Sequence, residues 1–264
     1  MKILATLLTA IFLHSCSNRT TNERTELLKE IRVDKLETSD TFVFEIDLTD
    51  KRISKASPLL SDNNDLKKLQ DRLPPSYLKF LKTYSNGLHI EIGNSLTIFP
   101  IGEVSGFWTD ILSLTNETLA DSSFPSKDFI FFGMSGVDSE MFGFYTAKQF
   151  DNGEYPIVWF TPGSADTKPF VLLNSSFDKF LTMQYYLLKA SDYEETYATY
   201  EEAAKASSDK NAMEEDRNNW QNYLDKLYDT FDPTIPKPNH DYYKSAISLT
   251  ELNETIELTR NNSR

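Results

Sequence analysis

The chain has 264 residues, of which 39% are hydrophobic and 25% are charged, so it can bury a core and is not disordered throughout. Forty acidic residues against 27 basic ones give a net charge of −13, and a surface of that sign repels a phosphate backbone, which argues against nucleic acid as a direct partner. Cys16 is the only cysteine, which excludes an internal disulfide, a thiol nucleophile in the folded domain and a cysteine-rich zinc site.

The first sixteen residues predict export and lipidation. Lys2 precedes an apolar run over residues 3–13 that is too short to cross a bilayer. The run ends in Leu13-His14-Ser15-Cys16, which resembles a bacterial lipobox, with an apolar residue at −3, a small one at −1 and the cysteine that becomes lipidated. We therefore predict a signal peptide over 1–15, a lipidated Cys16 with a polar tether over 16–25, and a lipid-anchored protein of the bacterial cell envelope, in the periplasm or at the outer membrane. An ordinary secretory signal is the alternative.

The elements before residue 66 are short. Helical spacing of leucine and isoleucine predicts a helix within 26–33, and strict alternation from Phe42 to Leu48 predicts a strand. The acidic cluster over 62–65 lacks the glycine and the later glutamate of an EF-hand, so it favours the capped start of a helix over a calcium site.

The stretch over 73–100, LPPSYLKFLKTYSNGLHIEIGNSLTIFP, carries the strongest local signals. Pro74 and Pro75 suit the first turn of a helix, and Asn86-Gly87 supplies the stop that a helix end favours. Apolar and polar residues then alternate on both sides of Gly93-Asn94, which predicts a β-hairpin packed on its own helix.

Further strands are predicted over 129–134, 141–147, 155–160 and 170–173, after one or two helical turns within 107–114 and a loop over 121–127. Ser175 and Asp178 resemble a capping box that opens a helix with Phe177, Phe180, Leu181, Gln184, Tyr185 and Leu188 on its inner face. This order predicts an α+β domain over 26–190.

The sequence over 191–264 predicts a helical C-terminal extension, with two amphipathic helices and a further helix within 242–252. Its candidate roles are to cover a sheet edge and to supply a specificity surface.

Five segments resemble, in this order and at suitable spacing, the SUKH superfamily, whose Smi/Knr branch is named for a fungal cell-wall assembly regulator. They are LPPSYLKFLKTYSNG, LTIFPIGEV, FIFFGMSGVDSEMFGFYT, YPIVWF and FVLLNSSFDKFLTM, and the resemblance as a whole covers about residues 66–188. The resemblance implies a twisted, mainly antiparallel sheet with flanking helices. It also implies an immunity protein, because bacterial members mostly bind and neutralise toxins delivered by neighbouring cells. Many relatives look cytoplasmic, whereas an export signal is predicted for this chain.

Little in the sequence points to catalysis. After the signal peptide the chain has only His89 and His240, no Gly-x-Ser-x-Gly elbow, and no close ligand spacing for a metal. Asp138 and Glu140 could work as an acid and base pair, but turn charges in an acidic chain are the simpler interpretation. We therefore predict no catalytic residue, no metal and no cofactor.

The predicted partner surface combines exposed acids with aromatic residues: His89, Glu91, Trp108, Asp138 and Glu140. Acids complement a basic toxin, and tryptophan is a common interface anchor, whereas Trp159 is predicted to be core. The predicted function is neutralisation of a basic toxin by binding and occlusion, with membrane contact through the lipid alone. The alternative is an envelope scaffold or cell-wall assembly protein without a toxin partner, and an envelope hydrolase ranks third.

Overall fold

The computed structural model describes residues 51–55, 68–83, 86–91, 95–103, 106–122, 124–135, 140–150, 152–160, 168–197 and 210–262. The predicted signal peptide, Cys16, the tether, the helix within 26–33, the strand from Phe42 to Leu48 and the cluster over 62–65 lie outside these residues. Within the described residues, no helix combines the length and the apolar character that a membrane span needs.

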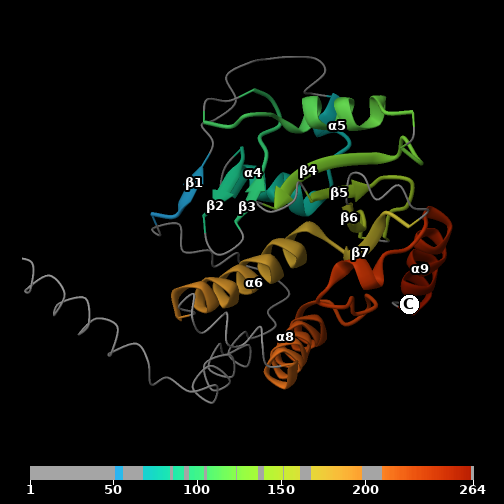
Figure 1. Ribbon diagram of the computed structural model, residues 1–264. Helices are drawn as coiled ribbons and strands as arrows, with labels where there is room; N and C mark the ends of the chain where they lie inside the picture. Colours follow the sequence, from blue (N-terminus) through green and yellow to red (C-terminus); the bar gives the residue numbers. More distant parts are fainter. Residues whose placement is uncertain are drawn as a thin grey trace, which may run out of the picture.

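A seven-stranded antiparallel sheet forms the centre of the fold, and its strands lie side by side in sequence order (Figure 1). The strands are β1 (Ile53–Lys55), β2 (Leu88–Ile90), β3 (Leu96–Ile98), β4 (Phe129–Ser135), β5 (Met141–Tyr145), β6 (Ile157–Phe160) and β7 (Phe170–Asn174). The predicted hairpin is confirmed as β2 and β3. The sequence analysis did not predict β1, which pairs with β2.

Helices cover both faces of the sheet, which confirms the α+β class with a helical C-terminal part. They are α4 (Pro75–Thr83), α5 (Ile111–Ala120), α6 (Phe177–Tyr197), α8 (Lys210–Phe231), the 3-10 helix η2 (Tyr242–Ser245) and α9 (Leu249–Asn262). Figure 1 shows α5 on one side of the sheet and α6 with α8 on the other. We call these sides the α5 face and the α6 face.

Helix α5 differs from its prediction in position. The turns expected within 107–114 start only at Ile111, where the Asp110 carboxylate accepts a hydrogen bond from the Ser113 backbone at 3.0 Å. The helix then runs to Ala120, and its Thr115 hydroxyl accepts the Phe131 backbone N–H at 3.0 Å. The aspartate cap therefore sets the start, and the contact with β4 fixes the helix on the sheet.

A β-bulge in β4 gives the α6 face an extra aromatic ring. Phe131 pairs with Gly143 and Gly133 with Phe142, so Phe132 is the additional residue. Its ring lies edge-on to the Phe177 ring of α6, with centroids 5.3 Å apart. A Cβ at Gly133 would lie 2.7 Å from the Thr97 carbonyl oxygen, so only glycine fits where β3 and β4 approach.

The starts of α4 and α6 are joined by one buried carboxylate. Glu154 accepts from the backbone N–H of Ser76 at 2.8 Å and from its hydroxyl at 2.7 Å. The Ser76 hydroxyl also accepts the Phe177 N–H at 3.2 Å. Burial raises the pKa of the Glu154 carboxyl above its usual value, while the hydrogen bonds from Ser76 act in the opposite direction.

The predicted capping box at Ser175 is wrong. Helix α6 begins at Phe177, and the Ser176 carbonyl accepts the Phe180 N–H at 3.1 Å, whereas the Ser175 hydroxyl donates to Asp232 at 2.8 Å. The Ser175 hydroxyl, which the local pattern had assigned to the cap of α6, is therefore bound to Asp232, a residue far along the chain. The predicted inner face is confirmed for four residues, which are buried: Phe177, Phe180, Leu181 and Leu188.

The C-terminal part packs into the same core as the sheet. Helix α6 continues past residue 190, where the predicted domain would end. Helix α8 buries Tyr223, Leu224, Leu227 and Tyr228 in the shared cluster, and α9 buries Leu252 and Ile256. The Ile247 N–H donates to the Phe170 carbonyl at 2.7 Å, so the segment before α9 pairs with the outer edge of β7.

Candidate partner-binding surface

One stretch of the α5 face carries polar side chains in register across neighbouring strands. His89 pairs with Ser54 on β1 and with Thr97 on β3, and Thr97 pairs with Met134 on β4. Because paired residues point to the same side of a sheet, these side chains form one row. The residues between them along β2 and β3 point to the α6 face and are buried: Leu88, Ile90, Leu96 and Ile98.

His89 is held between two neighbours in this row. Its Nδ1 lies 2.8 Å from the Thr97 hydroxyl, and its Nε2 lies 3.3 Å from a Glu91 carboxylate oxygen. The His89 side chain is 32% exposed and the Glu91 side chain 66% exposed. The carboxylate is thus presented to solvent while the imidazole fixes its position.

Trp108 adjoins the same row. Its side chain is 71% exposed, and its ring meets that of Phe99 edge-on at 5.1 Å. Phe99 follows Thr97 by two residues, so both point to the α5 face, and the buried Phe99 ring supports the indole from below. We use the term "outer face" for Ser54, His89, Glu91, Thr97, Met134 and Trp108.

The hydroxyl, imidazole and carboxylate of Thr97, His89 and Glu91 form a chain like that of a hydrolytic triad, but the surroundings do not suit acyl transfer. Thr97 lies in the middle of β3, whose backbone is paired on both sides with β2 and β4. The backbone N–H groups of β3 are therefore committed to the sheet and are not free to hold an oxyanion. The row can donate and accept hydrogen bonds toward a docked molecule.

Of the remaining two predicted residues, Asp138 lies outside the described residues, and Glu140 does not join this surface. Glu140 precedes β5 and faces away from the outer face, because its neighbour Met141 points to the α5 face, where it accepts the Thr118 hydroxyl at 3.8 Å. Glu140 instead accepts the Ser135 hydroxyl at 3.1 Å, and Ser135 pairs with Leu96. A single patch of five residues was expected, and strand alternation separates Glu140 from it.

Sequence reasoning missed Thr97 and Met134, whose side chains complete the row. The alternation of 96–98 predicted that Thr97 faces away from the core, but not that it would meet His89. Trp159 is buried, with 1% of its surface exposed, as predicted.

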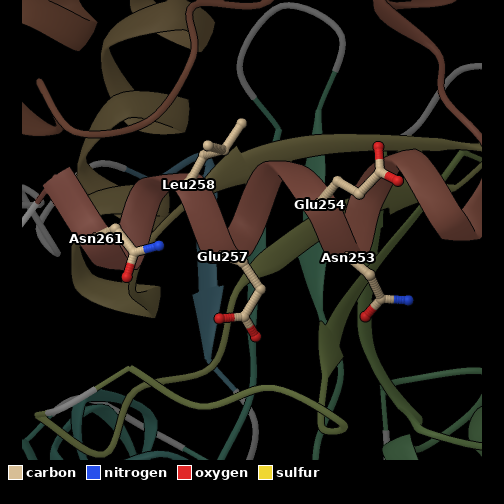
Figure 2. A pocket seen from close by; sticks show the side chains of 5 residues that line it. All are labelled: Asn253, Glu254, Glu257, Leu258 and Asn261. Carbon is tan, nitrogen blue, oxygen red and sulfur yellow. The ribbon is translucent and has the colours of Figure 1, made fainter.

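A shallow depression on α9 is lined by Asn253, Glu254, Glu257, Leu258 and Asn261 (Figure 2). Asn253 accepts the Tyr145 hydroxyl at 3.0 Å, and Glu257 pairs with Lys148 at 2.6 Å. These two contacts attach α9 to the end of β5. The polar residues of the depression therefore serve the packing of the helix against the sheet. Among the residues described, no three His, Cys, Asp or Glu side chains are grouped as metal ligands.

Part of the chain matches a known family. The model of the SMI1 / KNR4 family (SUKH-1) matches residues 66–183. A comparison with curated proteins finds no match. The matched range runs from just before α4, through β2 to β7, to the first turns of α6, so it holds most of the outer face and the aromatic core beneath it. Residues 66–183 of this chain form a domain of the SUKH superfamily.

Proposed function

We propose that this protein is a non-catalytic, lipid-anchored immunity protein that binds a toxin and covers its active or docking surface. The observation that carries the proposal is the outer face, which presents a 71% exposed Trp108 over Phe99 and, further along the same strands, the His89 and Glu91 pair. Its polar row lies on paired strands, so it is presented in a fixed arrangement. The SUKH domain supports a protein partner in general.

The chemistry of the outer face suits a basic partner. An exposed tryptophan supplies a large anchor at small entropic cost, and such residues dominate many interfaces. Glu91 adds a solvent-facing carboxylate, and the net charge of −13 steers a cationic protein toward the chain. We therefore propose a basic toxin, with Trp108 inserted against it and Glu91 paired with one of its cations.

The anchor belongs to the same proposal. A lipid on Cys16 would keep the protein at the envelope, where it meets a toxin during entry or one that attacks the envelope itself. Growth with an alkyne-tagged palmitate should label the full chain, and Cys16→Ser should abolish the label. A labelled Cys16→Ser chain would rule out this anchor.

Capture followed by rescue tests the function. The full chain, purified in mild detergent, is used to capture proteins from secreted and envelope fractions of the source strain and related strains. Each stoichiometric partner is then expressed alone and together with this chain. Immunity predicts a basic protein that stops growth when expressed alone and is tolerated in the presence of this chain.

A matched pair of double variants locates the surface. Trp108→Ala with Glu91→Gln should abolish capture and rescue, because both contact groups are lost. Leu258→Ala with Glu254→Gln removes an exposed apolar residue and an acid from α9, outside the family match, and should leave both intact. Capture of resident envelope proteins alone, with no toxicity to relieve, would refute the immunity proposal in favour of an envelope scaffold.

A further inference from the structure

A second surface lies on the α6 face, where the C-terminal part meets the sheet. Trp159 of β6 is buried, and its ring is packed by Tyr242 at 5.8 Å and by Tyr243 at 5.2 Å, both from η2. Tyr243 meets the indole edge-on and is itself 54% exposed. The indole N–H of Trp159 is buried and has no acceptor among the described residues.

Glu140 provides a negative charge on this second surface. The side chain is half-buried, it accepts the Ser135 hydroxyl at 3.1 Å, and within the described part of the chain it has no cationic partner. Glu140 lies two residues before Phe142, which pairs with Trp159, so its side chain is on the same side of the sheet as the Trp159 indole and diagonal to it. Burial first of all raises the pKa of Tyr242 to about 12, the hydrogen bond with Gln184 lowers it, and the Glu140 carboxylate adds to the rise.

The basic residues next to Tyr242 and Tyr243 along the chain are already paired or neutral. Lys244 pairs with Asp241 at 3.3 Å. The pKa of His240 is lowered, chiefly by burial and further by Lys244 and Arg217, so its imidazole is neutral at pH 7. The site therefore combines an exposed aromatic ring with an uncompensated carboxylate. We call Glu140, Trp159, Tyr242 and Tyr243 the "aromatic seam".

We propose that the aromatic seam binds an arginine side chain presented by a protein partner, with the guanidinium stacked on Tyr243 and hydrogen-bonded to the Glu140 carboxylate. Arginine fits better than lysine because its planar fork both stacks on an aromatic ring and matches a carboxylate with two parallel donors. The acidic net charge favours a cationic ligand over an anionic one.

This surface goes beyond the outer face and does not require that the partner be a toxin. Glu140 and Trp159 lie within the family match, whereas Tyr242 and Tyr243 come from the C-terminal part outside it. The two parts of the chain build the seam together. The C-terminal part thus gives this SUKH domain a recognition element of its own.

Indole resonances provide a direct test. The chain has three tryptophans, so the ¹⁵N-labelled full chain in mild detergent should give three indole N–H signals, assigned with Trp108→Phe and Trp220→Phe. The probe is the capped peptide Gly-Arg-Gly, and the matched control is the same peptide with citrulline, which keeps the shape without the charge. We expect a saturable shift of the Trp159 signal with the arginine peptide, and binding weaker by about tenfold with the citrulline peptide.

Matched variants and a free amino acid complete the test. Glu140→Gln and Tyr243→Leu should each raise the dissociation constant of the arginine peptide about tenfold. Glu254→Gln makes the same charge change on α9 and should leave this constant unchanged. Retained dispersion of the Trp108 and Trp220 signals checks that the variants are folded. The proposal is overturned if the Trp159 signal does not move, if all three indoles shift alike, or if free arginine binds as tightly as the peptide, which would mark a small-molecule site.

Discussion

The carboxylate of Asp232 accepts a hydrogen bond from the backbone N–H of Ser175 at 2.7 Å, and this bond joins two parts of the chain that the family match separates. Asp232 follows α8 and is fully buried, and Ser175 lies just before α6. The same carboxylate pairs with Lys179 at 3.0 Å. The start of α6 is therefore held by a residue from the C-terminal part.

Removal of the Asp232 carboxylate should destabilise the fold. Asp232→Ala leaves the Lys179 ammonium and the Ser175 N–H without their partner, and we expect the free energy of unfolding to fall by about 3 kcal/mol. Urea unfolding followed by tryptophan fluorescence measures the loss. The control is Asp229→Ala, which removes a surface pair with Lys237 and should cost less than about 1 kcal/mol. Equal losses in the two variants would mean that Asp232 does not join the parts.

Glu154 should make stability fall as pH rises. Its folded pKa is raised by burial, so between the unfolded and the folded pKa the folded chain binds more protons than the unfolded one. The cost of ionising the buried carboxyl is absent below the unfolded pKa and complete above the folded pKa. Glu154→Gln removes this titration and keeps an acceptor for the Ser76 N–H. Urea titrations from pH 4 to pH 7 should show the wild type losing stability relative to the variant, and a constant difference would contradict the prediction.

Gly133 should not tolerate a side chain. A Cβ there would approach the Thr97 carbonyl oxygen to 2.7 Å, and this oxygen belongs to the backbone of β3, which cannot move away from β4 without breaking the ladder. We expect Gly133→Ala to lower the free energy of unfolding by about 2 kcal/mol or more. Gly106→Ala is a useful comparison because no atom lies within 4 Å of its Cβ, and only its φ of +93° opposes the change. That strain costs about 1 kcal/mol. A smaller loss at Gly133 than at Gly106 would be inconsistent with this packing.

Truncation of two tryptophans should lower stability to different extents. Trp159→Ala removes a fully packed ring and should cost about 4 kcal/mol of stability. Trp108→Ala loses mainly one edge-on contact with Phe99 and should cost about 1 kcal/mol. Chemical unfolding of both variants measures these losses. A large loss at Trp108 would make it a core residue and would remove the outer face as a partner surface.

Local sequence signals were sufficient for most of the sheet. Pro74 and Pro75 start α4, the alternation after Asn86-Gly87 gives β2 and β3, and the apolar run before Gly133 gives β4. Each of these depends on residues next to one another in the chain. The three-residue β1 has no such pattern, because pairing with β2 rather than its own composition makes it a strand.

The site was harder to predict because it depends on register. His89 and Glu91 are two residues apart, so their common side of the strand follows from alternation alone. Their meeting with Thr97, and the separation of Glu140, require the pairing of β2, β3, β4 and β5. The aromatic seam is further from prediction still, because Tyr243 reaches Trp159 through the path of the C-terminal part.

The bridge between Phe170 and Ile247 closes one edge of the sheet with a segment that comes late in the chain. Because each strand pairs with the next one along the chain, all seven strands can pair without α8 or Ile247. Until Ile247 is in place, the outer edge of β7 has unpaired backbone groups, and two such edges on neighbouring chains can pair with each other. A chain cut before Ile247 should therefore aggregate more than the full chain.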